Sequence, residues 1–340
     1  MSGFQAEKAV VLAHYEALSR ATPESVSAIL SERVAHDWTW LGVHPFNEQS
    51  GVKAVAEAFW TPYLSAFSRV QRRQDIFFAG LNEVDGFKGV WVVSMGHLMG
   101  LFDAPWLGIR PTRKIAMLRY AEFNRVESGR IVETAFFCDI PHLMTQAGQS
   151  PFPPATAQHL VQPGPISHNG LLLEDAPDAE GKATLAIINA MIGDLGTWNL
   201  GIPLEEELAR TWHDDMIWWG PEGIGAAFTI ERYAKQHSGP FRAAFKERSK
   251  TGHLARLAEG HFGGFFGWPN FQAVHEGGFL GMPSSQGQMT EFRVVDIYLR
   301  RDDKLAENWI FIDMLHWMKS QGADVLGRLA TTDAGQMSGS

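Results

Sequence analysis

Several features that mark other protein classes are missing from this chain of 340 residues. Its single cysteine, Cys138, excludes a disulfide within the chain and favours a reducing compartment. No apolar run approaches the ~18 residues of a membrane span, and the first residues lack the basic region of a secretory signal. We therefore expect a cytoplasmic protein that does not enter a membrane.

The charges and motifs exclude further classes. The formal net charge is −9 and Lys and Arg form no cluster, which argues against nucleic acid as a partner. The sequence has no His-Glu-x-x-His motif, no cysteine pair and no Gly-Lys phosphate loop, so we expect neither a metal site nor a cofactor. A Gly-x-Ser-x-Gly nucleophile motif is missing as well.

Aromatic residues, by contrast, are abundant, with 12 Trp and 22 Phe. The hydrophobic share of 45% and the charged share of 20% are ordinary for a globular protein. The aromatic side chains are explained either as core residues or, for some of them, as the lining of a pocket for a small apolar molecule. The sequence leaves both interpretations open.

The most informative feature is an internal repeat. The segments Gly129–Met144 and Asp303–Met318 align at a constant offset, with Glu, Phe, Asp, His and Met in the same places. The aspartates of this block are Asp139 and Asp313. A repeat of this length indicates two copies of one domain, so every candidate site residue should occur twice.

The repeat extends upstream with changing offsets. Trp40 matches Trp218 at a slightly larger offset, and His97, which follows a glycine, matches His261 at a smaller one. Each change of offset marks an insertion or deletion, which surface loops tolerate.

The repeat and the proline content divide the chain. We predict a first domain over residues 5–148, a Pro-rich linker over 149–180, a second domain over 181–322 and a flexible tail over 323–340. We expect the two copies to pack as an internal pseudo-dimer; further association into a homo-oligomer is an alternative.

Periodicity predicts the same order of elements in each copy. Two helices and a short strand come first, and a third helix covers residues 51–67 in the first copy. Apolar and aromatic segments at 91–98, 115–126 and 130–139 then read as strands. The predicted fold class is α+β: two tandem cone-shaped domains, each a strongly curved antiparallel sheet wrapped by about three helices.

The first copy resembles the SnoaL-like polyketide cyclases of the nuclear transport factor 2-like superfamily. The resemblance rests on Gly96–Gly100, Leu107–Lys114, Gly129–Ile131, Glu133 and Asp139. It implies a cone-shaped pocket and an aspartate, here Asp139, that removes and returns a proton during an intramolecular aldol closure, without metal or cofactor.

The second copy carries the same pattern in Gly260–Gly264, Leu280–Pro283, Asp303–Leu305, Glu307–Trp309 and Asp313. Its loop after the proline departs from the family pattern. In the first copy, an alanine replaces the tryptophan of the last strand. The first copy is slightly favoured as the active one, because its loop is better preserved.

The last strand of each copy supports a pocket on physical grounds too. Side chains two residues apart share a face, which places a carboxylate in line with large aromatic residues. We interpret this face as the pocket wall, where burial would raise the pKa of Asp139 and Asp313. The predicted pocket residues are Trp40, Glu133 and Phe137 in the first copy and Trp218, Glu307, Trp309 and Phe311 in the second.

These residues support three hypotheses of function. The first is a cofactor-free acid/base enzyme, of the cyclase, isomerase or aldol type, that acts on a small apolar carbonyl compound. Asp139 and Asp313 would be its acid/base groups, assisted by His97 and His261. The alternatives are a non-catalytic module for a small hydrophobic ligand, with the aspartates bonded to backbone groups, and a protein-interaction scaffold. A recurring acidic position on the preceding strand of each copy is interpreted as structural.

Overall fold

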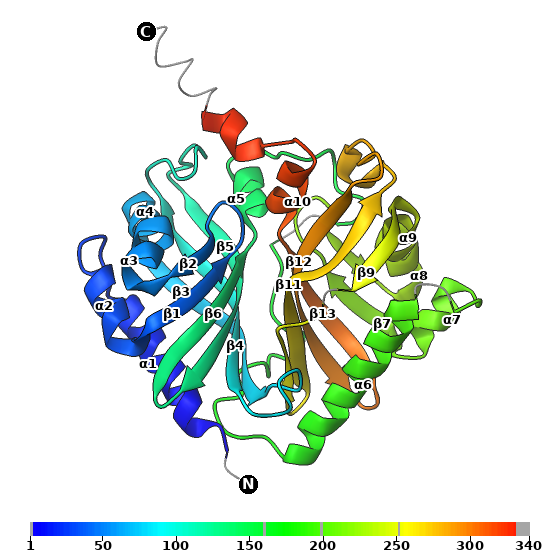
Figure 1. Cartoon of the computed structure of the whole chain (residues 1–340), viewed down its shortest axis with the longest axis horizontal. Helices are drawn as coiled ribbons and strands as arrows, with labels where there is room; N and C mark the ends of the chain where they lie inside the picture. Colours follow the sequence, from blue (N-terminus) through cyan, green and yellow to red (C-terminus); the bar gives the residue numbers. More distant parts are fainter. Residues whose placement is uncertain (1–2, 159–160, 198–199, 251, 331–340) are drawn as a thin grey trace, which may run out of the picture.

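Two curved sheets, each covered by helices on its outer side, make up the protein (Figure 1). The computed structural model describes residues 3–158, 161–197, 200–250 and 252–330. Part of the predicted flexible tail, residues 331–340, lies outside the described residues. None of the described helices is long and apolar enough to cross a membrane. The predicted α+β class is confirmed, and the residue limits of the two domains stay a prediction.

The first sheet has six strands in the order β2-β1-β6-β5-β4-β3, in which only β1 and β6 run parallel. The elements of this half, in chain order, are α1 (Gln5–Leu18), α2 (Val26–Arg33), β1 (Val34–Gly42), β2 (Asn47–Ser50), α3 (Gly51–Val55), η1 (Ala56–Trp60), α4 (Thr61–Ala66), β3 (Phe67–Leu81), β4 (Val90–Phe102), β5 (Ile115–Glu127), β6 (Arg130–Cys138) and α5 (Ile140–Gln146).

The second sheet has seven strands, in the order β10-β11-β12-β13-β7-β8, with β9 also paired to β11. Its elements are α6 (Asp178–Thr197), α7 (Leu204–Ala209), β7 (Trp212–Trp219), β8 (Ala226–Phe228), α8 (Ile230–Tyr233), η2 (Ala234–Ser238), α9 (Gly239–Ala244), β9 (Phe245–Lys250), β10 (Ala255–Glu259), β11 (Phe262–His275), η3 (Phe279–Gly281), β12 (Met289–Arg301), β13 (Lys304–Ile312) and α10 (Met314–Ser320).

The third helix of each half shows how closely the copies agree. In the first half α3, η1 and α4 form one continuous helical segment, and α8, η2 and α9 repeat it at the same offset that relates Trp40 to Trp218. In both halves the middle turn is π-helical, and a proline, which has no backbone N–H to donate, follows it at the second position of the last piece. The prediction of this helix is confirmed.

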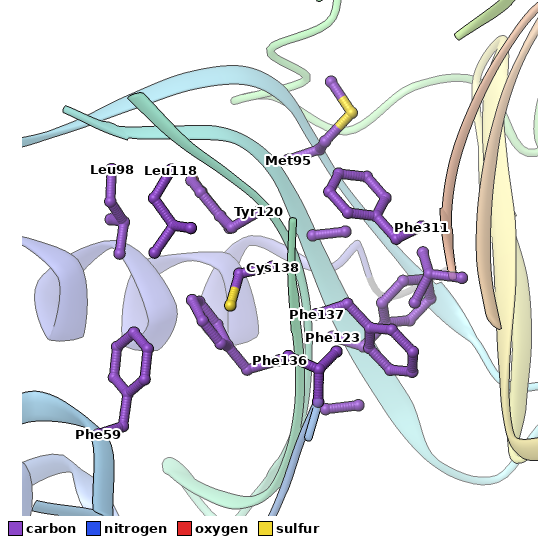
Figure 2. Close-up of a cluster of buried hydrophobic side chains, with 14 of the residues drawn as sticks. Phe59, Met95, Leu98, Leu118, Tyr120, Phe123, Phe136, Phe137, Cys138 and Phe311 are labelled. Carbon is purple, nitrogen blue, oxygen red and sulfur yellow. The ribbon is translucent and has the colours of Figure 1, made fainter. Parts of the chain in front are cut away.

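The last strand of the first half has two different faces (Figure 2). Phe136 and Cys138 point toward the helices of their own half, whereas Phe137 points toward Phe311 of the second half. The alternation follows from the two-residue period of a strand. The helix-facing side of each sheet is therefore the inside of a cone, and the other side is the contact between the halves.

Aromatic side chains fill the contact between the two sheets. Phe123 meets Phe266 with ring centroids 5.2 Å apart, and Phe137 meets Trp268 at 5.7 Å, both pairs edge to face. Such geometry is the favourable one for aromatic pairs, and each ring also removes a large apolar area from water. The two sheets thus cover each other's apolar faces.

A buried arginine crosses the same contact. Arg119 of β5 donates to the carbonyl oxygens of Ile310 at 3.0 Å and Trp219 at 3.1 Å, both in the second half, and lies 4.0 Å above the ring of Phe311. Burial lowers the pKa of Arg119 to about 9. Its hydrogen bonds supply acceptors for a charge that would otherwise be costly to bury.

Asp139 fixes the first half to the second. It caps the N-terminus of α5, where its Oδ1 accepts from the backbone N–H of His142 at 3.0 Å. Its Oδ2 accepts from the backbone N–H of Glu222 in the second half at 2.9 Å. Both carboxylate oxygens are therefore engaged in holding backbone groups.

Asp313 does the same in reverse. It caps α10 through His316 N–H at 3.1 Å and accepts from the N–H of His44 in the first half at 2.8 Å. His44 and Glu222 are themselves equivalent, since they follow the matched residues Trp40 and Trp218 at the same distance in the sequence. The two aspartates form a reciprocal pair of caps across the sheet contact.

The segment between the halves also covers a sheet edge. Strand β3 ends the first sheet, and the linker runs beside it through Phe77 N–H to Gly170 O at 2.7 Å and Leu172 N–H to Phe77 O at 2.8 Å. Covered edges are protected from pairing with other chains.

The reciprocal caps lead to a first prediction. Asp139→Ala or Asp313→Ala leaves two buried N–H groups without acceptors, so each should lower the free energy of unfolding by about 2–4 kcal/mol. Chemical denaturation measures the loss. Asp215→Ala, which removes an exposed ion pair with Arg301, is the control and should cost less than about 0.5 kcal/mol. Losses as small as the control at both caps would contradict the assigned role.

Candidate functional site

A cavity of about 310 Å³ lies inside the second cone, between its helices and the concave side of its sheet. Its helical side comes from α6, α7, η2 and α9, and its floor from the inward-facing residues of β12 and β13. Most of its lining is apolar or aromatic, and its volume suits a small molecule of one or two rings. Representative wall residues are Trp218, Tyr233, Phe241, Phe292 and Ile310.

Two buried carboxyl groups lie in this wall: Glu207, which is paired with Arg242, and Asp296 on β12. The Oδ1 of Asp296 accepts from the amide of Asn308 at 3.0 Å. Burial raises the pKa of Asp296 from 3.8 to about 7, although hydrogen bonds from Asn308 and Tyr298 lower it in part. Asp296 can therefore exist as acid and as base near neutral pH.

The equivalent carboxyl in the first half has a different environment. Glu122, paired across from Phe136 as Asp296 is from Ile310, forms a buried ion pair with Arg72 at 2.6 Å. The Arg72 guanidinium lies 3.8 Å from the ring centre of Tyr15. The first half thus neutralises its carboxylate with an arginine, whereas burial sets the pKa of Asp296.

Large side chains fill the inside of the first cone (Figure 2). Phe136 packs on Phe59 with centroids 5.0 Å apart and on Trp40 at 5.9 Å. At the positions equivalent to Phe136 and Phe59 the second half has Ile310 and His237. Smaller side chains at matched positions therefore open the second cone, so the slight preference for the first copy is not supported.

The histidine in the second cone comes from the π-helical turn η2. His237 stacks on Trp218 with ring centroids 4.0 Å apart and planes 19° apart. Burial lowers the pKa of His237 to about 3, so its imidazole is neutral at ordinary pH. A neutral imidazole can donate one hydrogen bond to a polar ligand atom.

Charged residues also line the cavity. Arg242 makes two bonds to the carboxylate of Glu207, at 2.6 and 3.0 Å. Arg248 donates to Leu195 O at 3.1 Å and lies 4.5 Å over the ring of Phe271. These contacts pair the charged groups of the lining with other groups of the protein. No group of three or more potential metal ligands gathers anywhere in the described residues.

The predicted acid/base pair does not lie in this cavity. Asp139 and Asp313 sit at the ends of the last strands, where each turns to cap a helix and to hold the other half. The strand alternation used to place them stops at these caps. Their geometry matches the alternative in which they accept backbone bonds and take no part in chemistry.

The predicted histidine pair is not a structural pair. His97 lies buried on β4 opposite Arg119, and its Nδ1 is 3.4 Å from Asp75. The residue equivalent to Arg119 is Arg293, which lies beside the bulge between Gly267 and Phe271, so the equivalent of His97 falls in that bulge.

His261 instead lies in the turn between β10 and β11. It is half exposed and its Nδ1 is 3.1 Å from the guanidinium of Arg300. The sequence match between the two histidines came from a shared Gly-His dipeptide, while the sheet register gives a different alignment. The prediction that His97 and His261 are equivalent is wrong.

The pocket face predicted on the last strands was assigned to the wrong side. Trp309 bonds to Pro163 O at 3.0 Å, and Glu307 accepts from Trp219 at 3.1 Å, both on the side away from the cone. The face rich in carboxylates and aromatics is the contact between the sheets. The misplaced residues are Glu133, Phe137, Glu307, Trp309 and Phe311; Trp218 lines the cavity, and Trp40 belongs to the filled first cone.

The sequence patterns do not identify Asp296 and His237 as residues of the candidate site. Asp296 was visible as a recurring acidic position with Glu122 but was interpreted as structural. His237 stands where the first half has Phe59, and a polar residue opposite an aromatic one in the other copy was the available signal. Comparing the two copies for differences as well as for similarities points to His237, whereas the recurring acidic position already marked Asp296.

Comparison with known proteins adds information on the fold. Neither a family model nor a curated protein matches the chain. A structure named as a SnoaL-like polyketide cyclase, from Jannaschia sp. CCS1, is 19% identical over 44% of this chain and 94% of its own, with a TM-score of 0.35. IdmH from Streptomyces antibioticus, named as a polyketide cyclase, is 16% identical over 41% and 96%, with a TM-score of 0.34.

A third similar structure, named as a polyketide cyclase from Xanthomonas campestris pv. campestris, is 19% identical over 43% of this chain and 99% of its own, with a TM-score of 0.34. Each match covers 41–44% of this chain and 94–99% of the chain in the similar structure. All three carry the name polyketide cyclase, which is also the family that the sequence resembles. At such low identities and TM-scores the likeness says nothing about activity.

The raised pKa of Asp296 predicts a pH effect on stability. Between about pH 4 and pH 7 the folded chain keeps this carboxyl protonated while the unfolded chain ionises it, so stability falls as pH rises through that window. Asp296→Asn removes this loss. Denaturation of both proteins should show the variant more stable above pH 7, by up to about 4 kcal/mol, and nearly equal to the wild type at pH 4. A constant difference at all pH values would contradict the raised pKa.

The contrast between the cones predicts a cavity-filling variant. Ile310→Phe gives the second cone the phenylalanine that the first half has at the equivalent position, Phe136. The added ring should fill the cavity and abolish binding of a small apolar fluorescent probe such as N-phenyl-1-naphthylamine. Fluorescence titration measures binding. Ile217→Phe is the control, because Ile217 is partly exposed on β7 and does not line the cavity. Equal probe binding by Ile310→Phe and the wild type would show that the probe binds elsewhere.

Proposed function

We propose that the second cone is the active site of an acid/base enzyme that acts on a small apolar carbonyl compound. The observation that carries the proposal is Asp296, a buried carboxyl group in an apolar cavity with a pKa of about 7. A carboxyl of this kind is suited to general acid/base catalysis, because efficiency is highest when the pKa lies near the working pH.

The reaction follows from the position of this group. Ionised Asp296 would take a proton from the carbon next to the substrate carbonyl, leaving an enolate, and would then return the proton to a carbon or oxygen atom. Isomerisation and intramolecular aldol closure both use these two steps. The neutral imidazole of His237, which lines the same cavity, is a donor for the enolate oxygen, while the hydroxyl of Tyr298 bonds to Asp296 itself.

The first half would act as a partner domain in this proposal. Its carboxylate is neutralised by Arg72 and its cone is filled by aromatic side chains. A duplicated domain needs only one working site, and the first copy supplies half of the sheet contact instead.

A non-catalytic binding module remains the second candidate. The wall is mainly apolar, and Asn308 holds one oxygen of Asp296, so a protonated Asp296 could simply accompany a bound apolar ligand. The scaffold hypothesis has less support, because it required a free apolar sheet face and the two sheets cover each other.

A generic proton-abstraction assay separates the two candidates. 5-Nitrobenzisoxazole is a small apolar molecule that gives up its C3 proton to a base; its N–O bond then breaks and a coloured cyanophenolate forms. The wild type should accelerate this reaction, with a rate that rises as pH passes about 7 and Asp296 ionises. Asp296→Asn should lower the rate by about 10²- to 10⁴-fold.

Two variants serve as controls for this assay. Asp313→Asn, at a buried carboxylate outside the cavity, should keep the wild-type rate per folded molecule. Ile310→Phe should lose the rate together with probe binding. If the wild type binds 5-nitrobenzisoxazole but does not accelerate its proton abstraction, the enzyme hypothesis is overturned in favour of the binding module.

A further inference from the structure

The hairpin between β3 and β4 of the first half, residues 82–89, covers strand β10, which lies at one edge of the second sheet. Glu83 N–H donates to Arg256 O at 2.9 Å, and Arg256 N–H donates to Asn82 Oδ1 at 3.0 Å. The Asn82 amide donates to Leu254 O at 3.1 Å. Strand β10 is the edge that these bonds protect.

The side chain of Glu83 goes further and joins two walls of the second cavity. Its Oε2 accepts from Arg256 Nε at 2.6 Å, and its Oε1 accepts from the amide of Asn189 at 2.9 Å. Arg256 on β10 lines the cavity directly. Asn189 belongs to α6, which also lines the cavity through Met191 and Ile192.

The bond to Arg256 leads into the cavity wall. The Arg256 guanidinium also contacts His253 Nδ1 at 3.3 Å. The ring of His253 stacks on Phe265 with centroids 4.0 Å apart and planes 8° apart. His253 and Phe265 both line the cavity, so a movement of Arg256 would be transmitted to the surface that a ligand touches.

The hairpin has no counterpart in the second half, where Glu259 at the end of β10 instead accepts from Lys8 Nζ at 2.6 Å and from Ala79 N–H at 2.7 Å in the first half. In the second half β10 ends at Glu259 and β11 begins at Phe262, so the equivalent turn has only Gly260 and His261. So short a turn does not reproduce the hairpin of residues 82–89. The first half therefore contributes to the cavity of the second, and the shortened turn explains part of the changing offset in the repeat.

We propose that Glu83 is a positioning residue for the second cavity: its carboxylate holds α6 and β10 together and so sets how tightly a ligand is retained. The proposal rests on the proposed site, although it concerns ligand retention rather than chemistry. It gives the filled first half a role beyond covering the sheet contact.

A general contribution to stability is the competing explanation. Partly exposed ion pairs stabilise proteins little, so loss of this pair should change the unfolding midpoint only slightly. A loosened cavity would instead show in the dissociation rate of a bound ligand, because opening of α6 away from β10 is a local event. The two explanations therefore differ in what they change.

The test compares two Glu→Gln variants in the full chain. Glu83→Gln should raise the dissociation rate and the Kd of N-phenyl-1-naphthylamine by roughly threefold to tenfold, measured by stopped-flow and equilibrium fluorescence. Glu133→Gln is the matched control: Glu133 pairs with Arg125 at 3.2 Å, with side chains 24% and 30% exposed, against 24% and 23% for Glu83 and Arg256. The control should keep both values within about twofold.

A double variant tests the connection through Arg256. Glu83 and Arg256 act through one contact. The double variant Glu83→Gln/Arg256→Gln should therefore raise the Kd of the probe by less than the product of the two separate increases. Equal dissociation rates for Glu83→Gln and Glu133→Gln, or purely multiplicative effects, would overturn the proposal. A wild type that binds the probe but fails the proton-abstraction assay would overturn only the proposed enzyme, since probe retention is still measured.

Discussion

The back-to-back packing of the two sheets is the constraint on which the rest of the structure depends. Neither sheet could leave its aromatic face in water, and each covers the face of the other through pairs such as Phe123 and Phe266. The reciprocal caps of Asp139 and Asp313 fix the angle and register of this contact. Because the contact uses one face of each sheet, the face under the helices is the one that lines the cavity of the second cone.

Within this shared frame the two cones have diverged by a few substitutions. Phe136 and Phe59 fill the first cone, while Ile310 and His237 leave room in the second. An ion pair with an arginine neutralises the first carboxyl group, and burial leaves that of Asp296 with a raised pKa. Duplication thus allows one half to stabilise and shape the other, since a filled core contributes packing that an open cavity lacks.

The fold was largely predictable from the sequence. Matched residues show that the chain contains two copies of one domain, and the periodicity of each copy predicts the same order of helices and strands. The site was not predictable, for three reasons. Period two cannot say which face of β13 meets the helices, so Trp309 was placed in the wrong wall. An N-cap residue that directly follows a strand cannot be told from a strand residue in the sequence, so Asp313 was assigned to the pocket wall. A shared Gly-His pair hid the different registers of His97 and His261, which only hydrogen bonding between strands reveals.

The proposed chemistry depends on Asp296 titrating near neutrality inside the second cone. Carbon-13 NMR of the aspartate carboxyl groups, with Asp296→Asn to assign the signal, measures this pKa directly in the intact chain. We expect a pKa of about 7 for Asp296. A signal for Asp296 that titrates at about 4, as in an exposed aspartate, would contradict it.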